Sequence, residues 1–374
     1  MSDSKQLFAR NLKLIRQSRN LSQVKLAELL SYTGKAVSKW ESGSALPPAE
    51  VLPRLAKVLN TDLNSLFNFR EDPSYFLGVD GGGTKTKFML TDSKGSVLKQ
   101  LVKGPCNPTS VGIDTAVSVL TDGIKEICQE IPFGKVSVFI GSAGCGIEAN
   151  RQTVTERLMC LNLSQLSVNG DGDNIISAGL KGQNGIVAII GTGSIIYSVI
   201  NKKRYRIGGY GHFIGDTFSG TEIGRGALEA VLAELDKSGE HTSLTDIITA
   251  KVGTDISKIL TDMYVEGKTY MAQFAFSVFE EAANGDKVAK AIIDRNVDAL
   301  SSKLAAALKN FPETSEVPVI LAGGITHFAD RFVDEIKSKI KDKRLKSIEI
   351  LDCEPVIGAV LLAGAPEVKE NENA

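Results

Sequence analysis

The spacing of hydrophobic residues changes near residue 70 of this 374-residue chain. Before that point apolar positions recur every three or four residues, as in Phe8, Leu12 and Ile15, which indicates amphipathic helices. From Tyr75 onward, short apolar runs of strand length alternate with longer helical stretches. Because such alternation is typical of α/β folds, we predict an all-α head over residues 1–68 and an α/β body over residues 75–366.

Two polar segments flank the predicted body. Residues 69–74 contain Pro73 and several charged side chains, so we expect a linker there. Residues 367–374 are acidic and poor in apolar side chains, which predicts a disordered tail. No run of 18 apolar residues occurs and the first residues form no apolar signal segment, so we expect no membrane span and a cytoplasmic location.

Helix start and stop signals predict a pair of short helices in the head. Ser22 is a suitable N-cap for a helix that runs to Leu30, and a short turn leads to a second helix over about residues 35–42. This arrangement allows the second helix to enter the major groove of DNA. The predicted DNA contacts are Lys35, Ser38 and Lys39, which share one helix face, and Gln23, which can bind a phosphate or brace a recognition residue.

The same stretch resembles the Cro/CI-type (XRE) helix-turn-helix family over about residues 6–67. The resemblance is carried by Leu21-Ser22-Gln23, Leu26-Ala27, Ala36-Val37-Ser38-Lys39-Trp40-Glu41-Ser42-Gly43 and Leu46-Pro47, which follow one another in the family's order. It implies a λ-repressor-like head that binds operator DNA, usually as a dimer. A helical interaction module that has lost DNA binding is the alternative.

The distribution of charge agrees with a head that meets phosphate. Residues 1–70 carry 11 lysines and arginines against 5 acidic residues, whereas the rest of the chain carries 32 basic and 39 acidic residues. A basic head on an acidic body favours contact with nucleic acid, although chance variation in surface charge would look the same. The five cysteines form no Cys-x-x-Cys pair and only three histidines occur, so we expect no structural zinc site.

A glycine-rich turn follows the first predicted strand of the body. Gly81, Gly82 and Gly83 let a phosphate approach the backbone closely, and Asp80 can hold Mg²⁺ through water. Neither a Walker A loop nor a Rossmann glycine pattern accompanies the turn. A glycine-rich hairpin turn would account for the triplet on its own. The candidate nucleotide contacts here are Asp80, Gly81, Gly82, Gly83, Thr84 and Thr86.

Two later turns have the same chemistry. Gly191-Thr192-Gly193-Ser194 lies between two apolar runs, and Gly323-Gly324 closes a late strand. If the three turns face one cleft, the first two can grip nucleotide phosphates from both sides. The third turn can then admit the adenosine.

These elements, in this order, resemble the BadF/BadG/BcrA/BcrD ATPase family, which includes N-acetylglucosamine kinases. The resemblance spans about residues 75–365 and includes the ending Glu354-Pro355-Val356-Ile357-Gly358-Ala359. It implies an actin/hexokinase/Hsp70-like body of two RNase H-like lobes, over about 75–185 and 186–366, hinged around a cleft for ATP and Mg²⁺.

The resemblance also implies an amino sugar deeper in that cleft. Its candidate ligands are Asn107, Asp171, His212 and Asp216. Two of these residues could instead have structural roles. Asp171 could cap a helix that starts near Asn174, and His212 could pack behind the cleft.

Two departures from the family pattern bear on catalysis. The family carries a general-base aspartate where this chain has Gly146, and glycine cannot accept the proton of a sugar hydroxyl. Glu148 could substitute for it, and Asp171 is the other candidate catalytic residue. Thr217 and Phe218 replace a glutamate and a glycine beside the sugar site. Both departures favour a binding fold with weakened chemistry.

Three hypotheses for function follow. The leading one is a sequence-specific, homodimeric transcription regulator whose body binds ATP, an amino sugar or both as effector. The alternative is an active ATP-dependent kinase of the N-acetylglucosamine type with a DNA-binding appendage. The third is an ATP-hydrolysing switch whose substrate is not a sugar.

Overall fold

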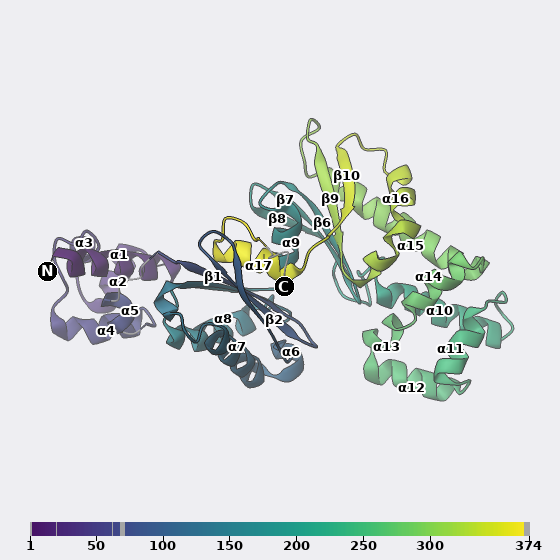
Figure 1. Cartoon of the computed structure of the whole chain (residues 1–374), viewed down its shortest axis with the longest axis horizontal. Helices are drawn as coiled ribbons and strands as arrows, with labels where there is room; N and C mark the ends of the chain where they lie inside the picture. Colours follow the sequence, from purple (N-terminus) through teal and green to yellow (C-terminus); the bar gives the residue numbers. More distant parts are fainter. Residues whose placement is uncertain (1, 20, 62, 68–71, 370–374) are drawn as a thin grey trace.

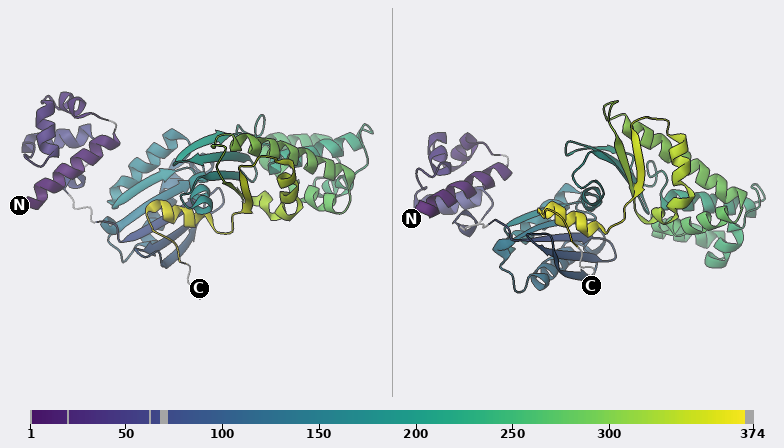
Figure 2. Two further views of the ribbon diagram at one scale, coloured as in Figure 1. Left: turned by 90° about the horizontal axis from the view of Figure 1, so that it is seen from above. Right: turned by 45° about the horizontal axis from the view of Figure 1, so that its top comes forward.

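The computed structural model describes residues 2–19, 21–61, 63–67 and 72–369. The molecule is elongated, with a helical head at one end and the helical layer of the second lobe at the other (Figures 1 and 2). Two five-stranded sheets form the centres of two lobes in the body. The predicted fold class, an all-α head on a two-lobed α/β body, is confirmed.

The head consists of short helices around one apolar core. In chain order they are α1 (Ser2–Ser18), α2 (Gln23–Leu30), α3 (Gly34–Glu41), the 3-10 turn η1 (Ala49–Val51), α4 (Leu52–Val58) and α5 (Leu63–Phe67). Ser22 caps α2 as predicted, because its Oγ accepts a hydrogen bond from the backbone N–H of Lys25 at 3.0 Å. Phe8, Leu12, Leu26 and Val37 are fully buried and join α1, α2 and α3.

Lobe I contains a sheet in the order β3-β2-β1-β4-β5. Its strands are β1 (Tyr75–Gly81), β2 (Thr86–Asp92), β3 (Val97–Lys103), β4 (Val136–Ser142) and β5 (Gln165–Asn169). The first three strands are antiparallel, whereas β4 and β5 run parallel to β1. One face packs against α7 and α8, within the series α6 (Pro108–Val111), α7 (Ile113–Ile127), η2 (Phe133–Lys135), α8 (Glu148–Leu158) and η3 (Met159–Leu161).

Lobe II repeats this topology, with the sheet order β10-β9-β6-β7-β8. Its strands are β6 (Gly185–Ile190), β7 (Ser194–Ile200), β8 (Lys203–Ile207), β9 (Val317–Ala322) and β10 (Leu345–Ile350). A large apolar core joins one face to the helical layer. That layer comprises α10 (Gly220–Leu235), α11 (Leu244–Val252), α12 (Ile256–Glu266), α13 (Lys268–Ala272), α14 (Ala275–Ala283), α15 (Lys287–Leu308), η4 (Gly324–Arg331) and α16 (Val333–Lys339).

Two helices cover the remaining faces of the sheets and do not follow chain order. The helix α17 (Pro355–Ala363) lies at the end of the chain but packs on lobe I, where Val356 and Val360 contact Phe76 and Phe139. The helix α9 (Gly172–Leu180) comes before β6 but packs on the sheet of lobe II. The predicted division at residues 185 and 186 is therefore wrong for these two helices.

The end of the described chain also differs from the prediction. The backbone N–H of Lys369 donates to the carbonyl of Gly95 at 2.8 Å, and its carbonyl accepts from Val97. This pairing along β3 orders residues 367–369, so the predicted disorder is wrong there. Residues 370–374 of the predicted tail and residues 69–71 of the predicted linker lie outside the described residues. None of the described helices is both long and apolar enough to cross a membrane.

Candidate functional site

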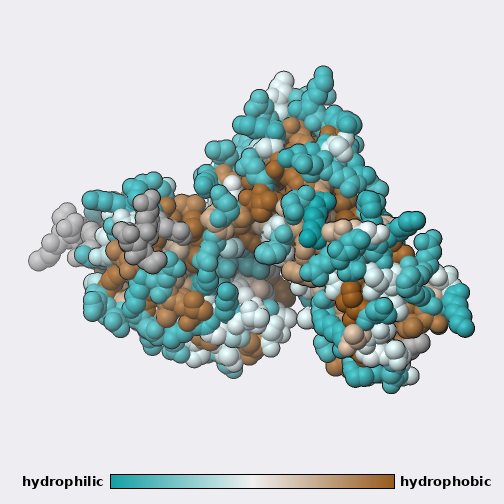
Figure 3. Space-filling view, turned by 45° about the vertical axis from the view of Figure 1, so that its right-hand side comes forward, coloured by the Kyte–Doolittle hydropathy of each residue, from teal (hydrophilic) through white to brown (hydrophobic). Residues whose placement is uncertain are grey.

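An open cavity of about 680 Å³ lies between the two lobes. Lobe I contributes the loop between β4 and α8, and the loop between β5 and α9 forms the floor. Lobe II contributes β7, β8 and the loop that follows β8. In the space-filling view the surface is hollowed between the lobes (Figure 3). The polar lining residues are Arg151, Asn169, Asp171, Asp173, Ser194, Tyr197, Arg204 and Asp216.

Asp171 presents its carboxylate to this cavity at the start of α9. Its Oδ1 accepts a hydrogen bond from the N–H of Gly172 at 3.1 Å, so Asp171 caps the helix and lines the cavity at the same time. Asp171 is exposed to the cavity, and partial desolvation by the surrounding protein raises the pKa of its carboxyl group. The helix-capping role of Asp171 is therefore confirmed, whereas its role as a sugar ligand stays a prediction.

The loop between β4 and α8 leaves open space where the family's catalytic carboxylate is expected. A Cβ on Gly146 would meet nothing within 4 Å. A Cβ on the neighbouring Gly144 would overlap Oδ1 of Asn107, which places Asn107 directly behind the cavity wall. The same Oδ1 caps α6 by accepting from the N–H of Thr109 at 3.0 Å. Asn107 thus adjoins the cavity without lining it.

The structure does not bring Glu148 into the cavity. Glu148 begins α8, its side chain is exposed, and it pairs with Arg151 and accepts a hydrogen bond from Gln152 at 2.7 Å. The cavity lining ends at Ile147 and resumes at Arg151, one helical turn later. The hypothesis that Glu148 replaces the missing base is therefore not supported by its position.

The glycine turn after β1 is tight on one side and open on the other. The N–H of Gly82 donates to the carbonyl of Lys85 at 2.9 Å, which closes the turn. A Cβ on Gly81 would overlap Cys106, whereas a Cβ on Gly83 would meet nothing within 4 Å. Thr84 is exposed, so the backbone from Gly83 to Thr84 is open to a phosphate.

Thr86 has a different role from the one predicted. Its side chain is fully buried, and its Oγ1 donates to the carbonyl of Gly104 at 2.7 Å. This bond ties β2 to the loop before α6. Thr86 therefore braces the turn and does not offer its hydroxyl to a nucleotide.

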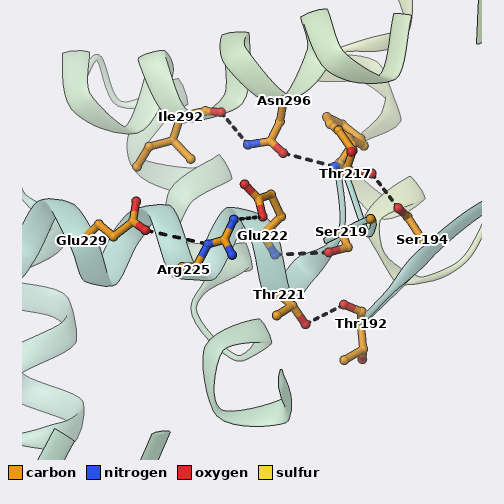
Figure 4. A network of polar contacts seen from close by, with 12 residues as sticks. Thr192, Ser194, Thr217, Ser219, Thr221, Glu222, Arg225, Glu229, Ile292 and Asn296 are labelled. Atoms are coloured by element: carbon orange, nitrogen blue, oxygen red, sulfur yellow. Dashed lines mark hydrogen bonds and ion pairs between the residues drawn. The ribbon is translucent and has the colours of Figure 1, made fainter. Parts of the chain in front are cut away.

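Hydrogen bonds join the turn between β6 and β7 to α10 and to the loop before it (Figure 4). The carbonyl of Thr192 accepts from Oγ1 of Thr221 at 2.7 Å, and Oγ of Ser194 donates to the carbonyl of Thr217 at 2.6 Å. The N–H of Gly191 donates across the turn to Gly193 at 2.9 Å. The side chain of Thr192 is exposed, whereas the hydroxyl proton of Ser194 is used in the hydrogen bond to Thr217.

The glycine pair after β9 lies beside this second turn. Gly323 adopts a φ of +104°, and a Cβ there would lie 2.6 Å from the carbonyl oxygen of Ile190. A Cβ on Gly191 would lie 4.0 Å from the backbone nitrogen of Gly324. The second and third turns therefore share one corner of lobe II. Of the predicted turn residues, only Gly193 and Ser194 line the cavity.

Asp80 is the next-to-last residue of β1, on the lobe I side of the cleft. Its Oδ1 accepts a hydrogen bond from Nδ2 of Asn174 at 2.7 Å. Burial raises the pKa of Asp80, the Asn174 bond opposes that rise, and the nearby charges of Asp171 and Glu354 add to it. Asp80 and Asp171 are thus close enough to influence each other, which connects the first glycine turn to the cavity.

The residues around Asp80 fit a magnesium–nucleotide complex. Within the described part of the chain, no three or more His, Cys, Asp or Glu side chains come together in a group that could hold a metal ion. A Mg²⁺ at Asp80 would therefore take most of its ligands from water and nucleotide phosphates, which is usual for Mg²⁺ in nucleotide sites. The open backbone at Gly83 suits the same ligand.

Comparison with known proteins identifies the body. The sequence profile of the BadF/BadG/BcrA/BcrD ATPase family matches residues 77–363. The chain belongs to the BadF/BadG/BcrA/BcrD ATPase family. A helix-turn-helix profile matches residues 12–66, so the chain joins a helix-turn-helix head to this ATPase domain.

The body is similar to sugar kinases, whereas the head is similar to a transcriptional activator. The chain is 30% identical over 313 residues to N-acetyl-D-glucosamine kinase of Dictyostelium discoideum, covering 77% of this chain and 97% of that protein. The head is 36% identical over 64 residues to the HTH-type transcriptional activator BcrR of Enterococcus faecalis, covering 17% of this chain and 31% of that protein.

Solved structures share the fold of the body, and one of them aligns with nearly the whole chain. A Chromobacterium violaceum protein provisionally assigned as an N-acetylglucosamine kinase aligns with a TM-score of 0.63 and 25% identity, covering 78% of this chain and 99% of that chain. A ROK family transcriptional regulator homologous to the Escherichia coli MLC protein covers 98% of this chain and 97% of its own, with a TM-score of 0.50 and 17% identity. At that identity the likeness concerns the fold alone.

The loop after β8 departs from the BadF/BadG/BcrA/BcrD pattern in a way that the structure explains. Phe218 is fully buried against Phe332 although its φ is +57°, a conformation that favours glycine. Oγ1 of Thr217 accepts a hydrogen bond from Lys303 at 2.5 Å. Asp216 lines the cavity and accepts from the N–H of Gly211 at 3.1 Å, whereas His212 does not line it and stacks on Phe213.

Three of the four predicted DNA contacts in the head are exposed on α3, and the fourth, Gln23, is hydrogen-bonded within the head. Lys35, Ser38 and Lys39 are exposed on α3, while Trp40 on the opposite face is buried. Nε2 of Gln23 donates to Glu41 at 2.8 Å, so Gln23 braces the end of α3. Glu41 also accepts from Nε of Arg16 at 2.5 Å.

Sequence reasoning missed five polar lining residues, Arg151, Asn169, Asp173, Tyr197 and Arg204. Asp173 and Arg204 form an ion pair that joins α9 to β8 across the cavity wall. Nη1 of Arg151 donates to Oδ1 of Asn169 at 3.3 Å. Asn169 ends β5, in which polar and apolar residues alternate, so no apolar run marks it. The two arginines lie on a polar helix and a polar edge strand, where no local pattern distinguishes them.

Proposed function

We propose that this protein is a transcription regulator whose kinase-like body binds MgATP and an amino sugar as effector. The main support for the proposal is the open space at Gly146 in a cavity that polar side chains otherwise line. Asp171 and Asp216 can accept hydrogen bonds from sugar hydroxyls, but no carboxylate stands at the position of the family's general base. The relative from Dictyostelium discoideum suggests N-acetylglucosamine as the first ligand to test.

Each group of residues has a definite task in this proposal. The backbone of the turns at residues 82–84 and 191–193 holds phosphate oxygens, and Asp80 holds the water shell of Mg²⁺. Bound MgATP supplies charge between the lobes and, in a kinase, a phosphoryl group. Asp171 on α9 binds the sugar and belongs to a helix that packs on lobe II, so ligand binding draws the lobes together. Closure alters operator affinity only to the extent that the ligand prefers the closed form.

The head supplies the output of the proposed regulator. Lys35, Ser38 and Lys39 form the exposed face of α3 that would enter the major groove of operator DNA. We infer a homodimer, because two heads on one operator match the symmetry with which such modules bind. Size-exclusion chromatography with light scattering, at the concentrations used for DNA binding, tests that state.

An active sugar kinase is the second candidate. It is favoured by Asp171, whose raised pKa makes its carboxylate a better proton acceptor than an ordinary aspartate. The two candidates separate in one pair of assays on the full chain. ADP release is measured with N-acetylglucosamine, glucosamine and N-acetylmuramic acid, and sugar binding is measured by calorimetry. Sugar binding without turnover, together with sugar-dependent operator affinity, supports the regulator. Robust turnover that Asp171→Ala abolishes supports the kinase.

A further inference from the structure

Asn174 lies where the two lobes and the cleft meet. It occupies the first turn of α9 and is fully buried. Its Nδ2 lies 3.3 Å from the carbonyl oxygen of Val79, 3.1 Å from that of Gly141 and 2.7 Å from Oδ1 of Asp80. The shortest of these three contacts is to the carboxylate. One amide group therefore connects α9 to the ends of β1 and β4.

Glycines on two other elements make room for Asn174, one for its side chain and one for its backbone. A Cβ on Gly141 of β4 would overlap Oδ1 of Asn174, and a Cβ on Gly358 of α17 would overlap its backbone carbonyl. Oδ1 is buried and has no hydrogen-bond partner among the described residues. An unpaired buried polar atom is costly, so the amide is not a favourable choice for packing alone. What the amide provides is the hydrogen bond to Asp80.

The surroundings of Asp80 show why that bond matters. The Asp80 carboxylate is close enough to Asp171 and Glu354 to feel both charges, and Glu354 is itself paired with Lys87. Repulsion from these two carboxylates acts on Asp80, and both the charge of Lys87 and the hydrogen bond from Asn174 oppose it. Asn174 is the donor that the described residues provide for Oδ1.

We propose that Asn174 is a positioning residue that holds Asp80 for the magnesium–nucleotide complex and couples that site to the amino-sugar site. This inference rests on the proposed function. The coupling follows from α9, because Asn174 stands one helical turn after Asp171 on a helix that packs on lobe II. Movement of α9 when the sugar binds therefore shifts the donor that orients Asp80. By reciprocity, each ligand changes the affinity of the other by the same factor.

The test measures MgATP binding to the full chain by calorimetry, at several Mg²⁺ concentrations, with and without N-acetylglucosamine. We expect Asn174→Leu to weaken MgATP binding by about 10-fold or more, since it removes a hydrogen bond to a charged group. The loss should be absent in an Asp80→Ala background. The sugar should strengthen MgATP binding to the unaltered protein and not to Asn174→Leu.

The matched control is Asn296→Leu. Asn296 is also buried, and it accepts from the N–H of Phe218 and donates to Ile292 within the core of lobe II (Figure 4). The Asn296→Leu variant removes an equivalent buried amide from lobe II, whereas Asp80 lies in lobe I. We therefore expect this variant to have lower thermal stability and unchanged MgATP affinity. Equal weakening of MgATP binding in Asn296→Leu and Asn174→Leu would overturn the inference, because it would reflect general destabilisation.

A second variant protects the test against misfolding of Asn174→Leu. Gly141→Ala keeps Asn174 but displaces its amide, so it should weaken MgATP binding in the same Mg²⁺-dependent way. Gly179→Ala on α9 is its control, because a Cβ there meets only the side chain of Ile320 at 2.9 Å. Unchanged MgATP binding in both Asn174→Leu and Gly141→Ala would overturn this inference alone. Failure of the unaltered protein to bind MgATP would overturn the proposed function and this inference together.

Discussion

Gly146 and Gly170 face each other across the floor of the cavity. A Cβ on Gly170 would lie 3.4 Å from Cα of Gly146, whereas a Cβ on Gly146 would project into space free of atoms within 4 Å. The two loops therefore approach closely without filling the volume beside them. That volume is where the family's general base is expected, and nothing in the loops prevents a longer side chain from entering it.

This geometry predicts that Gly146→Asp gains phosphoryl transfer. The new carboxylate would stand in the cavity near Asp171, and a general base typically contributes about 10²–10⁴-fold to such a reaction. We expect ADP release in the presence of an amino sugar to rise by about 100-fold over the unaltered protein. Coupled ADP-release kinetics with the sugars named above would measure the gain.

Gly134→Asp is a suitable control for that experiment. A Cβ on Gly134 also meets nothing within 4 Å, but the residue lies in η2 and does not line the cavity. It should leave ADP release unchanged. If Gly146→Asp binds sugar normally and still releases no ADP, the missing carboxylate is not what limits the reaction.

The parts of the fold that the sequence predicts well are those with local signals. The strands β1, β6 and β9 are apolar runs followed by glycine, and Ser22 marks the start of α2, so each was placed from its own residues. The strands β5, β8 and β10 were missed, because these edge strands carry polar side chains and lack a continuous apolar run. In β8, residues 203–206 are all exposed.

Contacts that join distant elements gave no such signal. The bond between Asn174 and Asp80 spans 94 positions, and Asn174 reads locally as an ordinary helix start. The placement of α17 on lobe I likewise depends on which sheet face is left uncovered, not on its own apolar sequence. Candidate ligands on the glycine turns and the loop at Asp171 could be named from the sequence. The hydrogen bonds that these residues already form within the protein could not be predicted in this way.

The positive φ of the buried residue Phe218 predicts that its glycine variant is more stable than its alanine variant. Loss of a buried Phe ring typically costs ~3–5 kcal/mol, and a left-handed backbone at a residue with a Cβ costs ~1–2 kcal/mol. We therefore expect Phe218→Gly to be less stable than the unaltered protein, yet more stable than Phe218→Ala by ~1 kcal/mol or more. Urea denaturation of both variants measures the difference. An alanine variant at least as stable as the glycine variant would contradict the positive φ.

Asp342 predicts a pH-dependent contribution to stability. Hydrogen bonds from Arg344 lower the pKa of Asp342 to about 2. A carboxyl group with a lowered pKa stabilises the fold above its unfolded pKa of about 3.9, and that contribution is lost as the pH falls toward 2. Asp342→Asn should therefore be less stable than the unaltered protein at pH 7. The two should converge below pH 4 in chemical denaturation, and a constant difference at every pH would count against the assignment.

The salt dependence of DNA binding provides the most direct check on the head. Lys35 and Lys39 are exposed on one face of α3, so replacing both with alanine should remove two phosphate contacts and leave the core intact. Each phosphate contact contributes a slope of about −0.9 to the plot of log affinity against log salt. We expect operator affinity to fall by ~10-fold or more at low salt and the slope to become shallower by about 1.8. Lys94→Ala with Lys125→Ala removes the same charge from lobe I, and it should change neither quantity. Equal effects of the two double variants would mean that net charge, and not α3, determines binding.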